Sequence, residues 1–411
     1  MVERKKLPIY LLITVLWCND YLLQYARIIT ARLPVISSLS GYLIPTVYAV
    51  VILLALPFLK VYTSDVVFIC CILMVYVISP VIHPETYFIW SNQVSRFLLT
   101  VVPFYFLGNF VVSYIRMERL LKYLYIFSIM TIIAKILYFF AFEYGRSNAW
   151  TDAGEMDQAY KLLPHICLVC YYLIKKPTVT KLSVLAVSSA YLLFLGNRGS
   201  VLILVICTAL LYLLTSPSKH RILIASIIVL VILIVIFSPL FDVMIQTLEE
   251  LASQLGMSVR IFEKLEEGSL TDSSGRDLQA ENIHAALANQ PMLGLGLYGD
   301  RVLNGTYAHS IFRELWVDFG YLFGSLLFIL IVAMFFRAFV GLQSKEHKAF
   351  LIILMGNGFF KLFFSGSYLT EDMFFYAVGM CVAMVRQTKI ANFALIPSIN
   401  KDRRRTGLYG N

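Results

Sequence analysis

The chain has 411 residues, of which 59% are hydrophobic and only 14% are charged. Soluble domains carry about 25% charged residues, and a mean hydropathy of +0.76 leaves too little polar surface to solvate a globule of this size. These values exclude a soluble enzyme, a nucleic-acid-binding domain and a disordered scaffold. The net charge of +9 is instead typical of a membrane protein with an excess of Lys and Arg on its cytoplasmic side.

Apolar segments long enough to cross a hydrocarbon core of roughly 30 Å recur along the chain. They lie at about residues 8–24, 36–58, 66–82, 95–114, 123–142, 161–174, 182–196, 200–215, 222–240, 315–336, 349–364 and 373–386. No alternating-strand pattern indicates a barrel, so each segment is predicted to be a helix that satisfies its own backbone in lipid. The sequence therefore predicts an all-α integral membrane protein with about 12 transmembrane helices.

Basic residues predict the orientation of these helices. Most of the 34 Lys and Arg residues fall in segments that are cytoplasmic if both termini lie inside. The predicted domains are transmembrane helices one to nine in 1–240, a large helical external loop over 241–310, the last three helices in 311–390, and a basic cytoplasmic tail over 391–411. The protein is thus expected to be a multi-pass membrane protein.

The external loop holds three further patterns. Apolar and charged residues alternate at helical spacing over 241–267, which predicts an amphipathic helix along the membrane surface. Ser274 then resembles an N-cap for a helix that runs to about Asn289. The segment GLGLYG at 294–299 matches the dinucleotide pattern GxGxxG, but a nucleotide site also needs a preceding strand and a βαβ unit, so a turn is predicted.

Two cysteines and three charged residues lie within apolar segments. Cys167 and Cys170 form a CxxC within an apolar segment, which favours packed thiols over a metal or redox site. No metal and no cofactor are expected. Asp20, Lys135 and Lys361 lie within apolar segments and should face the bundle interior or water, because a charge facing lipid is costly.

Three residues on the external side are candidates for chemistry. Arg198, in a tight turn at 195–200, is either an interfacial anchor or an anion clamp, since arginine offers phosphate a fork of donors. Arg276 should lie in the first turn of the loop helix, where a bound anion would complement the positive helix end. His309 lies just before the tenth helix, and the unperturbed pKa of a histidine suits proton transfer near neutral pH.

Carboxylates near the same face are candidate sugar-binding groups. Glu371 and Asp372 lie in a polar turn between the last two predicted helices, and Glu314 and Asp318 open the tenth. Carboxylates bind sugar hydroxyls, although a solvated turn would show the same residues.

The order of these features is similar to that of a known family. The tract from about residue 183 to 379 resembles the bacterial O-antigen polymerase and ligase superfamily of polytopic envelope glycosyltransferases. The matching features are GNRGS at 196–200, one large external loop with Arg276, the stretch 285–296, His309, ELWVDFG at 314–320, and SGSY at 365–368.

The resemblance implies a location in the bacterial inner membrane and a donor that is a polyprenyl-diphosphate-linked oligosaccharide at the external leaflet. An acceptor sugar hydroxyl attacks the anomeric carbon, and polyprenyl diphosphate leaves without a nucleotide, metal or other cofactor. By resemblance, Arg198 and Arg276 neutralise the diphosphate and His309 activates the hydroxyl. Membrane lipid, a chain-length regulator and a flippase are the implied partners, and no nucleic acid is expected.

The main hypothesis is a polymerase that moves a growing O-antigen or capsule chain onto a lipid-linked repeat unit. The first alternative is a ligase of the same superfamily, whose acceptor is the lipid A core. The second alternative is a flippase or transporter of lipid-linked oligosaccharide. Such a transporter often has two similar halves with broken helices, and no such duplication is visible in the sequence.

Overall fold

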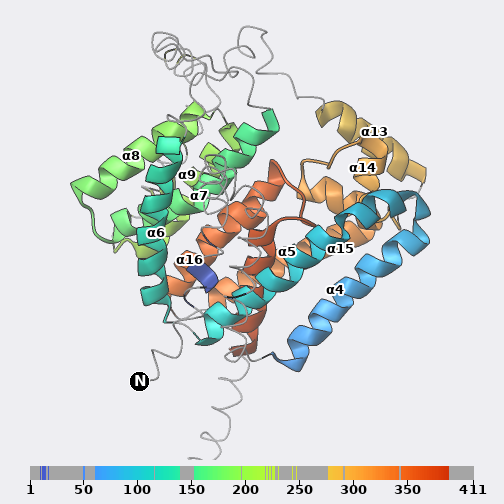
Figure 1. Ribbon diagram of the computed structural model, residues 1–411, viewed down its shortest axis with the longest axis horizontal. Coiled ribbons are helices and arrows are strands. Elements are labelled where there is room, and N and C mark those ends of the chain that lie inside the picture. Colours follow the sequence, from blue (N-terminus) through green and yellow to red (C-terminus); the bar gives the residue numbers. More distant parts are fainter. Residues whose placement is uncertain are drawn as a thin grey trace, which may run out of the picture.

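A computed structural model describes residues 61–138 except 115, 152–217 except 196, 276–289, 292–341 and 344–387, with scattered positions in 10–17, at 50 and in 219–247. Within these residues every regular element is a helix and no strand occurs (Figure 1). The predicted all-helical class is therefore confirmed for this part of the chain.

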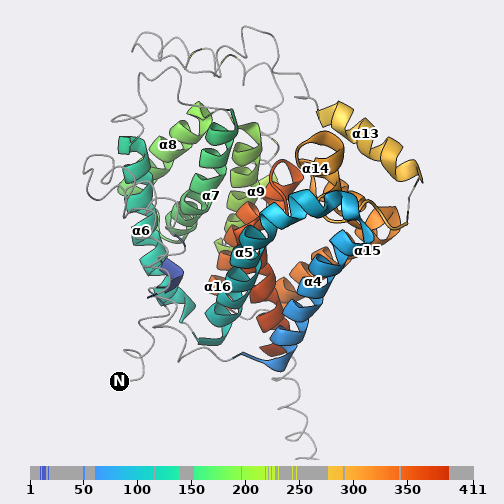
Figure 2. The ribbon, with the colours of Figure 1, turned by 45° about the vertical axis from the view of Figure 1, so that its right-hand side comes forward.

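The helices follow one another in a bundle with two small helices at one end (Figures 1 and 2). They are α4 (Thr63–Ile82), a 3-10 turn (Pro84–Thr86), α5 (Tyr87–Tyr114), α6 (Met117–Tyr138), α7 (Asp152–Lys175), α8 (Val179–Phe194), α9 (Arg198–Thr215), α13 (Arg276–Asn289), α14 (Gly299–Asn304), α15 (Ile311–Gly341) and α16 (Lys345–Met355). A π-helical turn (Gly356–Phe360) and a 3-10 turn (Lys361–Phe363) continue α16, and a last helix covers residues 372–387.

Each apolar segment predicted within the described ranges coincides with a helix. The segments 8–24, 36–58 and 222–240 lie largely outside the described residues, as does the predicted amphipathic helix at 241–267. The loop helix predicted to end near Asn289 is α13, and its proposed cap Ser274 also lies outside.

Four helices of the described part are long and apolar enough to cross a membrane: Thr63–Ile82, Pro84–Val112, Met117–Leu137 and Ile311–Gly341. Only 17% of the most apolar window of the last one is buried, and large side chains such as Phe336 on α15 and Val81 on α4 are 69% and 78% exposed. Apolar surface of this extent is expected to face lipid rather than water. These helices are compatible with a membrane protein, while the total of about 12 spans stays a prediction.

The helix predicted at 315–336 is present within α15, but it breaks at Gly320, whose φ of 78° and ψ of 169° are essentially reserved for glycine. Trp316 Nε1 donates to Ser325 Oγ at 2.9 Å across the break. Residues nine apart in a straight helix would be separated by about 13 Å, so the chain bends sharply between these two residues. The short first segment, 311–319, carries Glu314 and Asp318.

The turn predicted at 294–299 is present and stabilises this break. Gly294 and Gly296 have φ of 70° and 79°, and the Leu295 N–H donates to the Val317 carbonyl at 2.6 Å. The Leu297 N–H donates to Ser79 Oγ of α4 at 2.8 Å. The glycines thus allow a tight turn that joins α13 to α14 and packs against both α4 and α15.

Close backbone packing joins α5 to the last helix. A side chain at Gly108 would overlap the Tyr376 carbonyl, and one at Gly379 would overlap the Tyr105 carbonyl. Small residues let membrane helices approach this closely.

We therefore expect Gly379→Val to lower the thermal unfolding midpoint in detergent by several degrees and to reduce the yield of monodisperse protein, since overpacking costs about 1–3 kcal/mol. Val340→Ile, at a 62% exposed position of α15, is the control. An unchanged midpoint for Gly379→Val would contradict the packing.

Candidate functional site

Tyr160 of α7 lies where the start of α9 meets the loop before the last helix. Asn197 caps α9 by accepting a hydrogen bond from the Ser200 N–H at 3.2 Å. A side chain at Gly199 would overlap the Tyr160 hydroxyl and approach Phe364 to 3.2 Å. Gly199 is therefore required for the buried Tyr160 ring to lie against the first turn of α9.

A buried ion pair lies beside Tyr160. Lys361 Nζ is 2.6 Å from Glu371 Oε2, the two side chains are 11% and 9% exposed, and Lys361 Nζ is 5.4 Å from the centre of the Tyr160 ring. Burial raises the pKa of Glu371 to about 7, although the Lys361 cation opposes this shift. Lys361 thus faces the interior as predicted, and so does Lys135, which is 1% exposed, while Asp20 lies outside the described residues.

His309 lies in the segment between α14 and α15, with a φ of 54° that is uncommon for a residue with a side chain. Its ring is 4.1 Å from the ring of Tyr307, whose hydroxyl is 3.4 Å from Ser365 Oγ. His309 Nδ1 is buried and makes no hydrogen bond to any described residue. Burial, and then the nearby Arg276 cation, lower the pKa of His309 to about 4, so its imidazole is neutral at neutral pH.

Arg276 is the first residue of α13 and is half-buried. Its cation is close enough to His309 and to the Tyr160 hydroxyl to act on both electrostatically. Arg198 is the first residue of α9, but its side chain lies outside the described part. The structure therefore brings Arg276 and the Lys361–Glu371 pair close to Tyr160, and His309 close to Arg276 and Tyr307.

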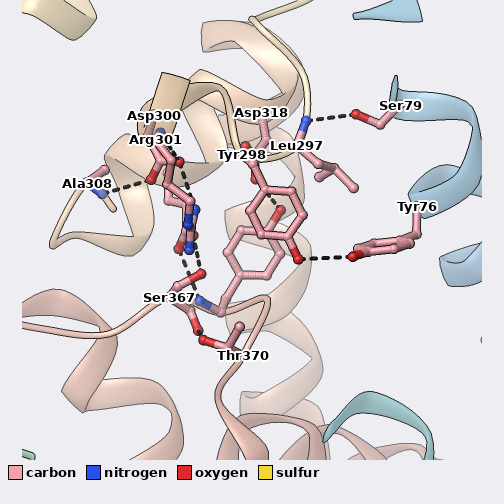
Figure 3. Close-up of polar contacts among 12 residues, drawn as sticks. Tyr76, Ser79, Leu297, Tyr298, Asp300, Arg301, Ala308, Asp318, Ser367 and Thr370 are labelled. Atoms are coloured by element: carbon pink, nitrogen blue, oxygen red, sulfur yellow. Dashed lines mark hydrogen bonds and ion pairs between the residues drawn. The ribbon is translucent and has the colours of Figure 1, made fainter. Parts of the chain in front are cut away.

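The remaining candidate carboxylates lie in different surroundings. Glu314 and Asp318 are 1% and 3% exposed. Glu314 accepts hydrogen bonds from Ser367 Oγ and, at 3.0 Å, from the Tyr368 N–H, whereas Asp318 accepts one from the Tyr368 hydroxyl at 2.5 Å. Figure 3 shows Asp318 within this buried polar cluster. Asp372 instead begins the last helix beside Glu371.

An apolar cavity of about 450 Å³ opens between α4, α5, α15 and the last helix. Its walls include Phe68, Phe97, Leu327, Tyr368 and Phe375. The polar contribution to these walls is small, and Tyr368 belongs to the same loop that joins Lys361 to Glu371. The cavity is therefore almost entirely apolar and borders this loop through Tyr368 and Leu369.

No family model matches the chain. Comparison with curated proteins also finds no match to its sequence. The resemblance to O-antigen polymerases and ligases is therefore based on the order of the motifs, and it stays a prediction.

Cys167 and Cys170 are free, buried thiols in the core of the described helices, as expected for packed side chains. Within the same residues, no group of three or more His, Cys, Asp or Glu side chains is placed to hold a metal ion.

The sequence patterns did not predict Tyr160, Tyr307 or Arg301, whose Nη1 lies 3.4 Å from Glu314 Oε1. Tyr160 lies at the edge of an apolar segment, where nothing in the spacing sets it apart from other core tyrosines. One signal for Arg301 is present in the sequence: Asp300 and Arg301 are adjacent residues of opposite charge, directly after the glycine turn.

Proposed function

We propose that this protein is an integral membrane polysaccharide polymerase, which transfers a growing O-antigen or capsule glycan from polyprenyl diphosphate to a lipid-linked repeat unit. The observation that carries the proposal is that Arg276 and Lys361 lie near Tyr160 at the start of α9, while His309 lies near Arg276. Cations next to a neutral base are what displacement of a diphosphate by a sugar hydroxyl requires.

The cations suit a departing diphosphate. Arg276 offers a fork of N–H donors, and Lys361 adds a second positive charge whose partner Glu371 has a raised pKa of about 7. The first turn of α9 contributes the positive end of its dipole. Arg198 begins that turn and is proposed as the second arginine of the diphosphate site.

The base is His309. Its neutral imidazole takes the proton of the acceptor hydroxyl as the oxygen forms a bond to the anomeric carbon. The bond from that carbon to the diphosphate oxygen breaks, and the diphosphate carries away the electron pair. Its Nδ1 makes no hydrogen bond to a described residue, so this nitrogen is available to accept one from a substrate. Glu371 and Asp372 at the edge of the site are proposed to bind sugar hydroxyls.

A lipid-linked donor also needs a place for its hydrocarbon chain. The apolar cavity between α4, α5 and α15 lies among helices apolar enough to cross a membrane, and Tyr368 at its wall is three residues before Glu371. A polyprenyl chain in this cavity would leave its diphosphate at the polar end of the helices.

The proposal places the chain in a bacterial inner membrane, with residues 241–310 outside and both termini inside. We expect the cysteine in Gly268→Cys, in a background without other cysteines, to react with a membrane-impermeant reagent in intact spheroplasts, because the basic residues favour this orientation. The cysteine in Gly407→Cys, in the basic tail, should react after permeabilisation. The reverse pattern would overturn the topology and the site assignment with it.

A gel of lipopolysaccharide or capsule from a strain deleted for the gene tests the function. Loss of the polymer ladder with a single repeat still attached to the core supports the polymerase. Bare core with polymer left on its carrier indicates a ligase, and repeat units held on the cytoplasmic leaflet indicate a flippase; either result overturns the proposal.

A further inference from the structure

Arg301 lies at the centre of a buried ionic cluster beside the site (Figure 3). Its Nη1 donates to Asp300 Oδ1 at 2.8 Å and lies 3.4 Å from Glu314 Oε1. Its guanidinium also covers the Tyr298 ring at 4.8 Å. The Asp300 and Glu314 side chains are 0% and 1% exposed, so both carboxylates rely on Arg301 and on hydrogen bonds instead of water.

Each carboxylate holds one loop of the site through its remaining hydrogen bonds. Asp300 Oδ2 accepts a hydrogen bond from the Ala308 N–H at 2.8 Å, next to His309. Glu314 accepts from Ser367 Oγ and from the Tyr368 N–H, within the loop that ends at Glu371. Arg301 therefore connects the segment that carries His309 to the loop that carries Glu371.

The composition of the cluster argues against a purely stabilising role. Asp300, Glu314 and Asp318 place three buried carboxyl groups near one arginine. Desolvation of buried charges costs several kcal/mol per ion, and apolar residues of similar volume often stabilise a core equally well. What apolar residues cannot do is accept the hydrogen bonds from Ala308 and Tyr368.

We propose that Asp300, Arg301 and Glu314 are positioning residues, which hold the His309 segment and the 365–371 loop in a fixed relation to each other. The two loops carry the base and the sugar-binding groups of the proposed polymerase. The effect of this cluster on catalysis therefore rests on that proposed function. The cluster itself touches neither the donor nor the acceptor.

Asp300→Asn is the sharpest variant, because it keeps the size of the side chain and weakens the contacts with Arg301 and Ala308. Asp65→Asn is the matched control: Asp65 is also buried and paired with an arginine, Arg386, at 2.7 Å, but its cluster joins α4 to the last helix away from the site. The titration of His309 is followed by NMR of histidine-labelled protein in detergent, with His309→Gln used to assign its signal among the six histidines.

We expect the pKa of His309 to rise from about 4 toward its ordinary value of about 6.5 in Asp300→Asn, because the released segment admits water, and to stay unchanged in Asp65→Asn. In sugar transfer, kcat should fall roughly 10- to 100-fold with little change in KM. If Asp300→Asn does not fold, Ser367→Ala removes one hydroxyl donor to Glu314 and should lower kcat by about 3- to 10-fold with KM unchanged.

The outcomes separate this inference from the proposed function. An unchanged His309 titration in folded Asp300→Asn, or wild-type kcat in Ser367→Ala, would overturn the positioning role even if the protein is a polymerase. A shifted titration in a protein that transfers no sugar would support the positioning role and contradict the polymerase.

Discussion

Arg276→Ala should abolish polymer formation, with sugar transfer reduced by about 10²- to 10³-fold, the loss typical of removing one donor to a developing negative charge. Arg276 lies beside His309 and the Tyr160 hydroxyl, at the point where the diphosphate would leave. Arg198→Ala should have an effect of the same size if the start of α9 also faces the diphosphate. Chain-length profiles on gels, normalised to the amount of protein in the membrane, measure both variants.

Charge and geometry can be separated at the same position. Arg276→Lys keeps the charge but loses the fork of donors, so partial activity is expected. Arg337→Ala is the control, because Arg337 is exposed on α15 beyond its break. Wild-type chain lengths in well-expressed Arg276→Ala and Arg198→Ala would reduce both arginines to interfacial anchors.

His309→Ala should slow sugar transfer by roughly 10²- to 10⁴-fold, while binding of the lipid diphosphate changes little. The reason is that His309 takes the acceptor proton, whereas the cations hold the donor. Turnover and donor binding are measured separately on purified protein in nanodiscs. Retained turnover in His309→Gln would remove His309 from the mechanism.

The pH profile shows which group is the base. An unperturbed histidine would lose activity below about pH 6.5. In this site the pKa of His309 is lowered to about 4, so the imidazole stays neutral and active down to that pH, and the acid limb should lie near pH 4. An acid limb near pH 7 that persists in His309→Gln would instead identify Glu371, whose pKa is about 7, ahead of Glu314, Asp318 and Asp372.

The sequence predicted the helices well where hydrophobicity alone decides them. The segments at 66–82 and 200–215 agree with α4 and α9 to within a few residues. Helix α5 begins at Tyr87, whereas the apolar pattern predicted a start near residue 95. Polar residues such as Asn92 interrupt that pattern, but they are accommodated in the helix, where the Asn92 side chain donates to the Phe88 carbonyl. The break at Gly320 was missed because it depends on contacts with the distant 294–299 turn.

The candidate site was predicted only in part. Residue type and position identified Arg276, His309 and Lys361, since charges near apolar segments are costly and therefore informative. Their arrangement near Tyr160 and Tyr307 could not be predicted, because it depends on how α7, α9 and the last loop pack. The adjacent charges of Asp300 and Arg301 are visible in the sequence, but their cluster was missed because its other contacts involve backbone N–H groups or residues far apart in the sequence.

The most direct measurement of the central claim uses purified protein in nanodiscs with a synthetic polyprenyl-diphosphate-linked repeat unit as both donor and acceptor. The account predicts a ladder of longer glycans and release of polyprenyl diphosphate, with both products lost in Arg276→Ala and retained in Arg337→Ala. Failure of the folded wild-type protein to lengthen any repeat from its own organism, or equal lengthening by Arg276→Ala, would contradict it.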